Sequence, residues 1–76
     1  MVVLKKREEE KELSDYKISL AAARVNVEMT QNDVAKKLGV SNKTVINWEK
    51  GTVQPSLATL NYLSELYKIP IDNLQV

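Results

Sequence analysis

The sequence predicts a small all-α domain with five helices. Its apolar residues recur at spacings of three and four, the helical period, and several of these segments follow a Ser, Thr or Asp that can cap a helix. Gly39 and the pair Ile69-Pro70 mark places where helices end. The 76 residues provide one domain and leave no room for a second core.

The composition excludes several kinds of site. The chain has no Cys and no His, which excludes disulfides, thiolate metal sites and the commonest catalytic base. No combination of nucleophile, base and orienting group stands out, so the sequence predicts neither an enzyme nor a bound metal or cofactor. No apolar stretch approaches a membrane span, and Met1 to Leu4 precede the charges that a signal peptide would place first. We therefore expect a cytoplasmic, nucleoid-associated protein.

Residues 1–14 are predicted to form a charged arm, either mobile or a frayed helix, ahead of a domain at 15–76. Lys5 and Glu9 have the spacing that supports a helix, but the arm has few apolar side chains to bury. Two alternatives remain open. The arm contacts DNA, which its glutamates disfavour, or its first apolar residues pack on a second subunit: Val2, Val3 and Leu4.

A first helix is predicted from Ser14 or Asp15 to about residue 26. Its alanines allow neighbouring helices to approach closely. Asn26 can take the left-handed conformation at the end of this helix. Four residues are expected on the inner side: Ile18, Ala21, Ala22 and Val25.

The stretch from Thr30 to Gly51 is the most informative part of the chain. The Thr30 hydroxyl can accept a hydrogen bond from the first turn of a helix, and Asp33 occupies the reciprocal capping position. Val34 and Leu38 lie four apart and share one face of this helix.

A second helix follows almost at once. Gly39 ends the preceding helix, because glycine adopts the left-handed conformation without a Cβ clash. Val40 and the new cap Ser41 form a connection that is too short for antiparallel packing. The segment therefore predicts a helix-turn-helix.

The second helix has two different sides. At roughly 100° per residue, one side spans an arc of about 140° and holds amides, lysines and one isoleucine: Asn42, Ile46, Lys50, Lys43 and Asn47. Such amides pair with adenine, lysine pairs with guanine, and isoleucine can touch a thymine methyl group in the major groove. The other side holds Thr44, Val45, Trp48 and Glu49. We expect Trp48 to pack in the core.

A loop from Thr52 to Pro55 leads to a helix that Ser56 caps and that runs to about Lys68. Its core residues are expected to be Leu57, Leu60, Leu63 and Tyr67. Pro70 breaks the helix, and residues 71–74 are expected to form a short last turn. The candidate dimer contacts are Tyr62, Leu66, Leu74 and Val76.

The charge is unevenly distributed. The net charge is +1, from a net −1 in residues 1–15 and a net +2 in residues 16–76. Four lysines lie in or beside the predicted helix-turn-helix: Lys36, Lys37, Lys43 and Lys50. This local positive charge favours phosphate binding, although it is weaker than a non-specific DNA binder shows.

Residues 16–74 resemble the XRE or Cro/repressor family of helix-turn-helix proteins. Gln31 opens the motif, Ala35 provides the small residue where the helices cross, and Trp48-Glu49-Lys50-Gly51 is similar to the family's W-E-x-G ending. Its apolar positions hold Val34, Leu38, Val40, Val45 and Trp48, and its next helix begins with Pro55-Ser56-Leu57 and Leu60. Many members of the family have glycine in the turn before the motif, where this chain has Asn26.

This resemblance implies a five-helix, lambda repressor-like fold and roles for named side chains. Arg24 and Glu49 are expected to form an ion pair that ties the first helix to the recognition helix. Removing one buried partner would cost about 3–5 kcal/mol. Bases are expected to be read by Asn42, Lys43, Ile46 and Asn47. The DNA backbone is expected to be held by Gln31, Ser41, Lys50, Thr52, Gln54 and Ser56.

The expected function is sequence-specific binding of double-stranded DNA by a transcriptional regulator, a repressor of the phage or prophage type from a bacterium or phage. One recognition helix reads few base pairs, so we expect a homodimer on two half-sites, formed in some cases only on DNA. One alternative is an antitoxin that binds a toxin partner and also regulates its own gene. Another is a helical protein-interaction module without DNA binding, which the low net charge favours.

Overall fold

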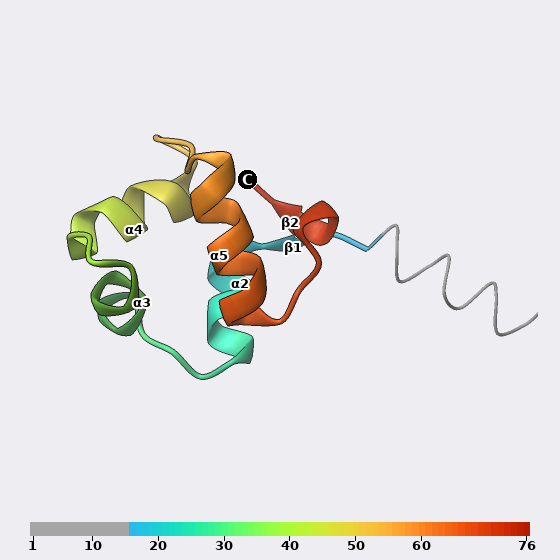
Figure 1. Cartoon of the computed structure of the whole chain (residues 1–76), viewed down its shortest axis with the longest axis horizontal. Helices are drawn as coiled ribbons and strands as arrows, with labels where there is room; N and C mark the ends of the chain where they lie inside the picture. The colour runs from blue at the N-terminus through green and yellow to red at the C-terminus, as the bar shows by residue number, and fades with distance from the viewer. Residues whose placement is uncertain (1–15) are drawn as a thin grey trace, which may run out of the picture.

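The computed structural model describes residues 16–76, which form four α-helices, one 3-10 helix and a pair of short strands (Figure 1). In chain order the elements are β1 (Ile18–Ser19), α2 (Leu20–Asn26), α3 (Gln31–Leu38), α4 (Asn42–Lys50), α5 (Leu57–Tyr67), η1 (Ile71–Asn73) and β2 (Leu74–Gln75). The mainly helical prediction is confirmed, but the count of five helices is wrong. The predicted last turn is a 3-10 helix, and the strand pair was not expected. The predicted arm at residues 1–14 lies outside the described residues.

The predicted start of the first helix is wrong within the described part. Tyr16 and Lys17 are not helical, and α2 begins at Leu20 after the cap Ser19, whose Oγ accepts a hydrogen bond from Ala22 N at 3.1 Å. Ile18 instead pairs in parallel with Leu74. The contact between distant segments outweighs the local preference for helix.

The predicted inner side of this helix is wrong for Ala22 and Val25, whereas Ile18 and Ala21 are half-buried. Leu20 and Ala23 are the buried residues of α2, whereas Ala22 is exposed and 61% of Val25 is exposed. Ile18 is half-buried and packs against the core, but it does so from β1 and not from the helix. Asn26 does not take the left-handed conformation; Glu28 does, with φ of 60°.

In α5 the buried stripe is shorter than predicted. Leu63 and Tyr67 are buried and Leu60 is half-buried, but Leu57 is 70% exposed and lies at the first turn, outside the core. Leu74 is buried, so it does not offer a free surface to a second subunit.

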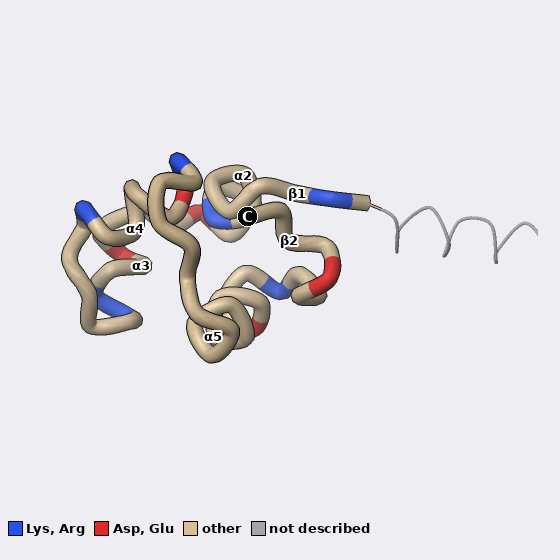
Figure 2. Tube along the Cα trace, turned by 90° about the horizontal axis from the view of Figure 1, so that it is seen from above, with Lys and Arg blue, Asp and Glu red and all other residues tan. Residues whose placement is uncertain are grey.

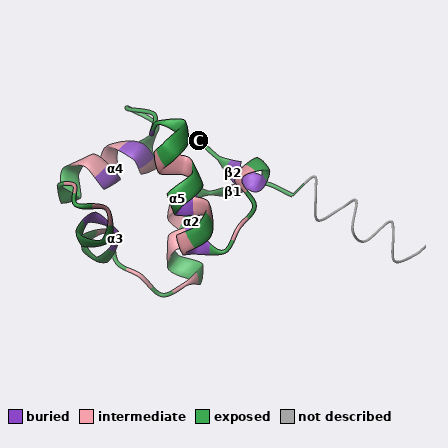
Figure 3. Cartoon of the chain, viewed as in Figure 1, coloured by how far each residue is buried: buried purple, intermediate pink, exposed green. Residues whose placement is uncertain are grey.

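One hydrophobic core joins all four α-helices and β2. Figure 3 shows buried segments on α3, α4 and α5, and mostly exposed residues in the loop that connects α4 to α5, where only Pro55 is buried. The core consists of Leu20, Ala23, Val34, Ala35, Val45, Trp48, Leu63, Tyr67 and Leu74. The predicted burial of Trp48 is confirmed, with 8% of the residue exposed. None of the helices in residues 16–76 has the length and apolarity needed to cross a bilayer.

Candidate nucleic-acid interface

The candidate interface is built on α3, α4 and the turn between them. Thr30 and Asp33 form the reciprocal cap of α3: Asp33 N donates to Thr30 Oγ1 at 3.0 Å, and Thr30 N donates to Asp33 Oδ2 at 2.9 Å. These hydrogen bonds, and above all the one from the Thr30 backbone, hold the pKa of Asp33 below its ordinary value. The start of α3 is therefore fixed by its own first turn.

The turn between α3 and α4 is also held by hydrogen bonds between near neighbours. Gly39 has φ of 70°, and its N–H and that of Val40 donate to the carbonyls of Lys36 and Ala35, at 3.4 and 3.0 Å. This is the glycine-terminated arrangement that satisfies the last carbonyls of a helix. Ser41 then caps α4 by accepting a hydrogen bond from Thr44 N at 3.1 Å. The two helices are joined by only three residues.

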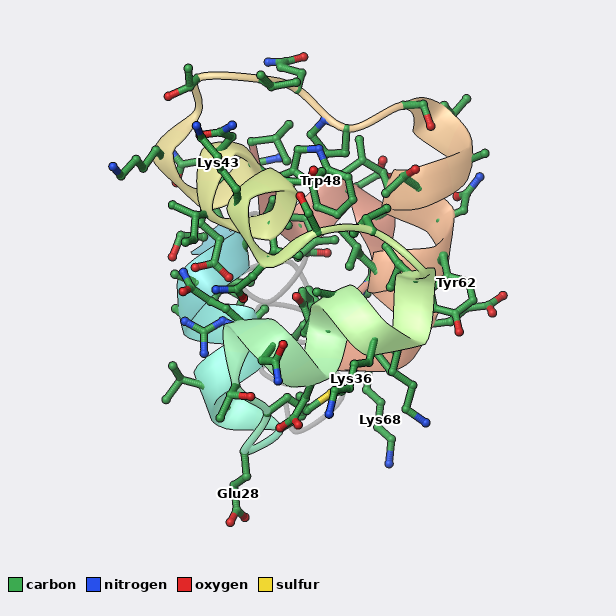
Figure 4. The ribbon with its side chains drawn as sticks, turned by 90° about the vertical axis from the view of Figure 1, so that its left-hand side faces the viewer. Glu28, Lys36, Lys43, Trp48, Tyr62 and Lys68 are labelled. Atoms are coloured by element: carbon green, nitrogen blue, oxygen red, sulfur yellow. The ribbon has the colours of Figure 1, made fainter. Side chains whose placement is uncertain are left out.

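The polar side of α4 faces away from the core. Asn42, Lys43 and Lys50 are exposed, and Ile46 and Asn47 are half-buried. Val45 and Trp48 on the other side are buried. Figure 4 shows Lys43 and Trp48 on opposite sides of the helix. The predicted base-reading residues therefore form one solvent-accessible arc.

Glu49 holds α4 against two other elements. Its Oε2 accepts a hydrogen bond from Arg24 Nε at 2.7 Å, and its Oε1 accepts from Arg24 Nη2 at 3.3 Å and from Gln31 Nε2 at 2.9 Å. Arg24 Nη1 also donates to the Met29 carbonyl at 2.8 Å. The side chains of Arg24 and Glu49 are only 14% and 7% exposed. The orientation of α4 is thus tied to α2 and to the start of α3.

This cluster affects the nearby titrating groups. The hydrogen bond to Glu49 raises the pKa of Arg24, although burial opposes the shift. Burial raises the pKa of Tyr67 to about 12, and the charge of Glu49 adds to that shift. Arg24 and Tyr67 are therefore cationic and neutral, respectively, at neutral pH.

A sequence profile described as helix-turn-helix matches residues 20–74. The chain belongs to this helix-turn-helix family. The resemblance to the XRE or Cro/repressor proteins is thereby confirmed.

Three relatives cover parts of this helix-turn-helix domain. The transcriptional repressor RstR of the cryptic phage CTXphi from Vibrio cholerae is 39% identical over 51 residues, 67% of this chain and 46% of that protein. An uncharacterised HTH-type transcriptional regulator from Methanocaldococcus jannaschii is 41% identical over 46 residues, 60% of this chain and 70% of that one. Another from Archaeoglobus fulgidus is 37% identical over 46 residues, 60% of this chain and 66% of that one.

These matches differ in extent. The matched part spans about half of RstR and about two thirds of the other two regulators. No solved structure matches the chain significantly.

The hydroxyls predicted to hold the DNA backbone have partners within the domain. Ser56 Oγ accepts from Thr59 N at 3.2 Å and donates to Thr59 Oγ1 at 3.0 Å, so its hydrogen is already used. Ser41 Oγ shares a hydrogen bond with Thr44 Oγ1 at 2.8 Å. Thr44, which was assigned to the packing side, is thus part of a capping pair, as its position three residues after Ser41 could have indicated. Thr52 and Gln54 are exposed in the loop that follows α4.

The lysines of the helix-turn-helix do not form one patch. Figure 2 shows basic residues on both α3 and α4. In Figure 4, however, Lys43 projects beside α4 whereas Lys36 projects from the lower edge of α3. The positive charge near the reading arc is therefore supplied by Lys43 and Lys50 alone among these four lysines, and sequence spacing did not reveal this division. Within residues 16–76 no three acidic side chains come together as a metal site.

Proposed function

We propose that the chain binds specific double-stranded DNA through α4 and represses transcription. The observation that carries the proposal is the exposed arc of amides and lysines on α4, held from behind by Trp48 and Glu49. A rigid helix with such a face fits the major groove, where hydrogen bonds to base edges distinguish sequences.

The reading roles follow from the chemistry of each side chain. Asn42 and Asn47 present amides that suit adenine, and Lys43 presents a donor that suits guanine. Ile46 offers the apolar contact for a thymine methyl group. Lys50, at the C-terminal end of α4, contributes charge without base selectivity.

Backbone contacts are proposed for the start of α3 and the loop after α4. Gln31 donates one Nε2 hydrogen to Glu49, and an amide nitrogen carries a second hydrogen that remains for a phosphate. Gln31 would thus connect the DNA backbone to the residue that orients α4. Thr52 and Gln54, which are exposed in the loop after α4, would contribute further polar contacts. Ser41 and Ser56 act first as helix caps.

We also propose that two copies bind together. A single α4 reads only a few base pairs, so a homodimer on half-sites about one helical turn apart would supply the specificity that an operator requires. Repression would be steric, with the protein covering a promoter. The similarity to RstR, named as a phage transcriptional repressor, supports this sign of regulation.

The test is fluorescence anisotropy with a duplex selected from a random library and its scrambled counterpart, across a salt series. Asn47→Ala should cost about 1–3 kcal/mol on the selected duplex and relax base choice at one position. Lys50→Ala is the matched control: it should weaken both duplexes alike and reduce the salt slope by about one unit. Equal weakening of both duplexes by both variants would refute base reading by Asn47.

A comparison of duplexes that carry one or two half-sites tests whether two copies bind together. A duplex with two half-sites should bind two copies with a steeper concentration dependence than a duplex with one. Identical binding isotherms per half-site would show that the copies bind independently.

A further inference from the structure

A shallow hollow lies on the side of α4 opposite the reading arc. It has a volume of about 270 Å³ and is enclosed by the end of α3, the turn, Trp48 and the first half of α5. Its lining is mainly apolar: Leu38, Val40, Trp48, Ala58 and Tyr62, with Lys37 and Thr59. A second hollow of about 230 Å³ adjoins it and is lined by Tyr62, Glu65 and Leu66.

Tyr62 lines both hollows, so the two lie next to each other along α5, on either side of this side chain. Ala58, Tyr62 and Leu66 are spaced four apart and therefore follow one stripe of the helix. Tyr62 is 46% exposed and does not belong to the hydrophobic core, which is unusual for a large aromatic side chain. We call this surface the α3–α5 groove, defined by Lys37, Leu38, Val40, Ala58, Tyr62 and Leu66.

The charges around the α3–α5 groove are mostly positive. Lys37 forms part of its wall, Lys36 precedes it on α3, and Lys68 follows the end of α5. In Figure 4, Lys36 and Lys68 both project from the lower edge of the domain, and Tyr62 lies at its right-hand edge. None of these lysines makes an ion pair within residues 16–76, and Glu65 is the acid that lines the groove.

Size and charge limit what the groove accepts. Each hollow is smaller than the roughly 300–1,000 Å³ of a typical small-molecule site. A second copy of the chain is the competing occupant, and the oligomeric state of the Tyr62 variant below distinguishes it. An extended apolar stripe with basic edges instead matches a helix that is apolar on one side and acidic on the other.

We propose that the α3–α5 groove binds an acidic amphipathic helix of another protein. The apolar side of that helix would pack against Tyr62, Leu66 and Leu38, and its acidic residues would face Lys36, Lys37 and Lys68. The groove lies behind Trp48, whereas the reading arc faces the other way. This function is therefore separate from DNA binding and does not depend on it.

The experiment titrates the whole chain with a synthetic peptide of about 18 residues, long enough to form a helix. Leucines occupy one side of the peptide and glutamates the other, and it contains no aromatic residue. Trp48 is the single Trp of the chain and lines the groove, so its fluorescence reports occupancy. A second peptide with lysine in place of every glutamate tests the charge. The acidic peptide should give a saturable change and the basic peptide should give none.

Two variants locate the contact. Tyr62→Ala and Lys37→Glu should each weaken the acidic peptide by about fivefold or more. Lys17→Glu makes the same charge change beside the strand pair, away from the groove, and should leave the affinity unchanged within about twofold. Circular dichroism verifies that each variant is folded. If Tyr62→Ala does not fold, the affinity of Lys37→Glu alone decides whether the groove binds the peptide. Equal binding of both peptides, no saturable change, or binding that ignores both variants would overturn the proposal. A monomer–dimer shift caused by Tyr62→Ala, without a change in peptide affinity, would assign the groove to a second copy instead.

Discussion

The helix-turn-helix segment and the segment that closes the domain are held in different ways. In residues 30–51, the caps at Thr30, Gly39 and Ser41 are made by neighbours a few positions away. The closing segment joins the first described residues to the last. Asn73 Nδ2 donates a hydrogen bond to the carbonyl of Tyr16, which lies 57 positions earlier in the sequence. Lys17 Nζ donates a hydrogen bond to the Asp72 carbonyl at 2.5 Å.

The helix-turn-helix, which carries the proposed function, is therefore held by different contacts from the strand pair that closes the domain. The reading arc depends on local signals and on the Glu49 cluster, so its geometry is set wherever α2, α3 and α4 pack together. The strand pair joins segments that are far apart in the sequence, so its formation carries the entropic cost of closing a long loop. We therefore expect the two regions to open with different free energies. Four changes test this expectation, from the largest effect to the smallest.

Trp48→Ala should destabilise both regions together. Trp48 is in the core that all four α-helices share, and its truncation should cost about 3–5 kcal/mol. That loss is a large fraction of the stability of a small domain. Urea unfolding followed by circular dichroism measures it. Tyr62→Ala is the matched control because its side chain is exposed, and it should change stability by about 0.5 kcal/mol or less. Similar losses in the two variants would contradict the assignment of Trp48 to the shared core.

High pH should weaken the core at Tyr67. Its pKa is raised to about 12, against an ordinary value of about 10. The unfolded chain therefore loses this proton first, so the contribution is complete below pH about 10 and is lost as pH rises towards 12. The expected loss in the free energy of unfolding is about 2–3 kcal/mol across this pH range.

The measurement is the unfolding free energy as a function of pH. Tyr67→Phe should remove this part of the alkaline decline, whereas Tyr62→Phe, a change on the exposed side of α5, should retain it. An unchanged decline in Tyr67→Phe would show that the phenol does not titrate with folding.

Asn73→Ala should open the closing segment selectively. It removes the hydrogen bond to the Tyr16 carbonyl and leaves that group without this partner, at a cost of about 1–3 kcal/mol. Amide hydrogen exchange should accelerate in β1, η1 and β2 while α3 and α4 keep their protection. Gln75→Ala, at an exposed position of β2, is the control. Equal acceleration in α4 would mean that the two regions unfold as one.

The same contrast explains what the sequence could predict. Thr30, Asp33, Gly39 and Ser41 act on backbone groups within the next turn, so their roles are visible in the order of residues. The exposed arc of α4 follows from helical periodicity once that turn is known. This is why the bounds of α3 and α4 and the exposure of the polar arc could be anticipated.

The start of α2 could not be predicted in the same way. Ile18 belongs to a strand because Leu74 lies beside it, and no feature between residues 14 and 26 indicates that pairing. Which side of α2 is buried, the side of Leu20 and Ala23, is also set by the neighbouring elements. The exposure of Leu57 and the separation of Lys36 from Lys43 likewise depend on how helices pack, which periodicity within one helix does not define.

Thr30→Ala should have the smallest effect and should stay within the helix-turn-helix. Loss of the Thr30 hydroxyl removes one half of the reciprocal cap and should cost about 1 kcal/mol, with faster exchange at the first amides of α3 only. Combined with Asn73→Ala, it also provides the sharpest comparison of the two regions. Because the two sites share no hydrogen-bond partner, their costs should add within about 0.5 kcal/mol in the double variant. A larger deviation would show that the cap of α3 and the strand pair are coupled, and that the recognition segment is not held independently of the closing one.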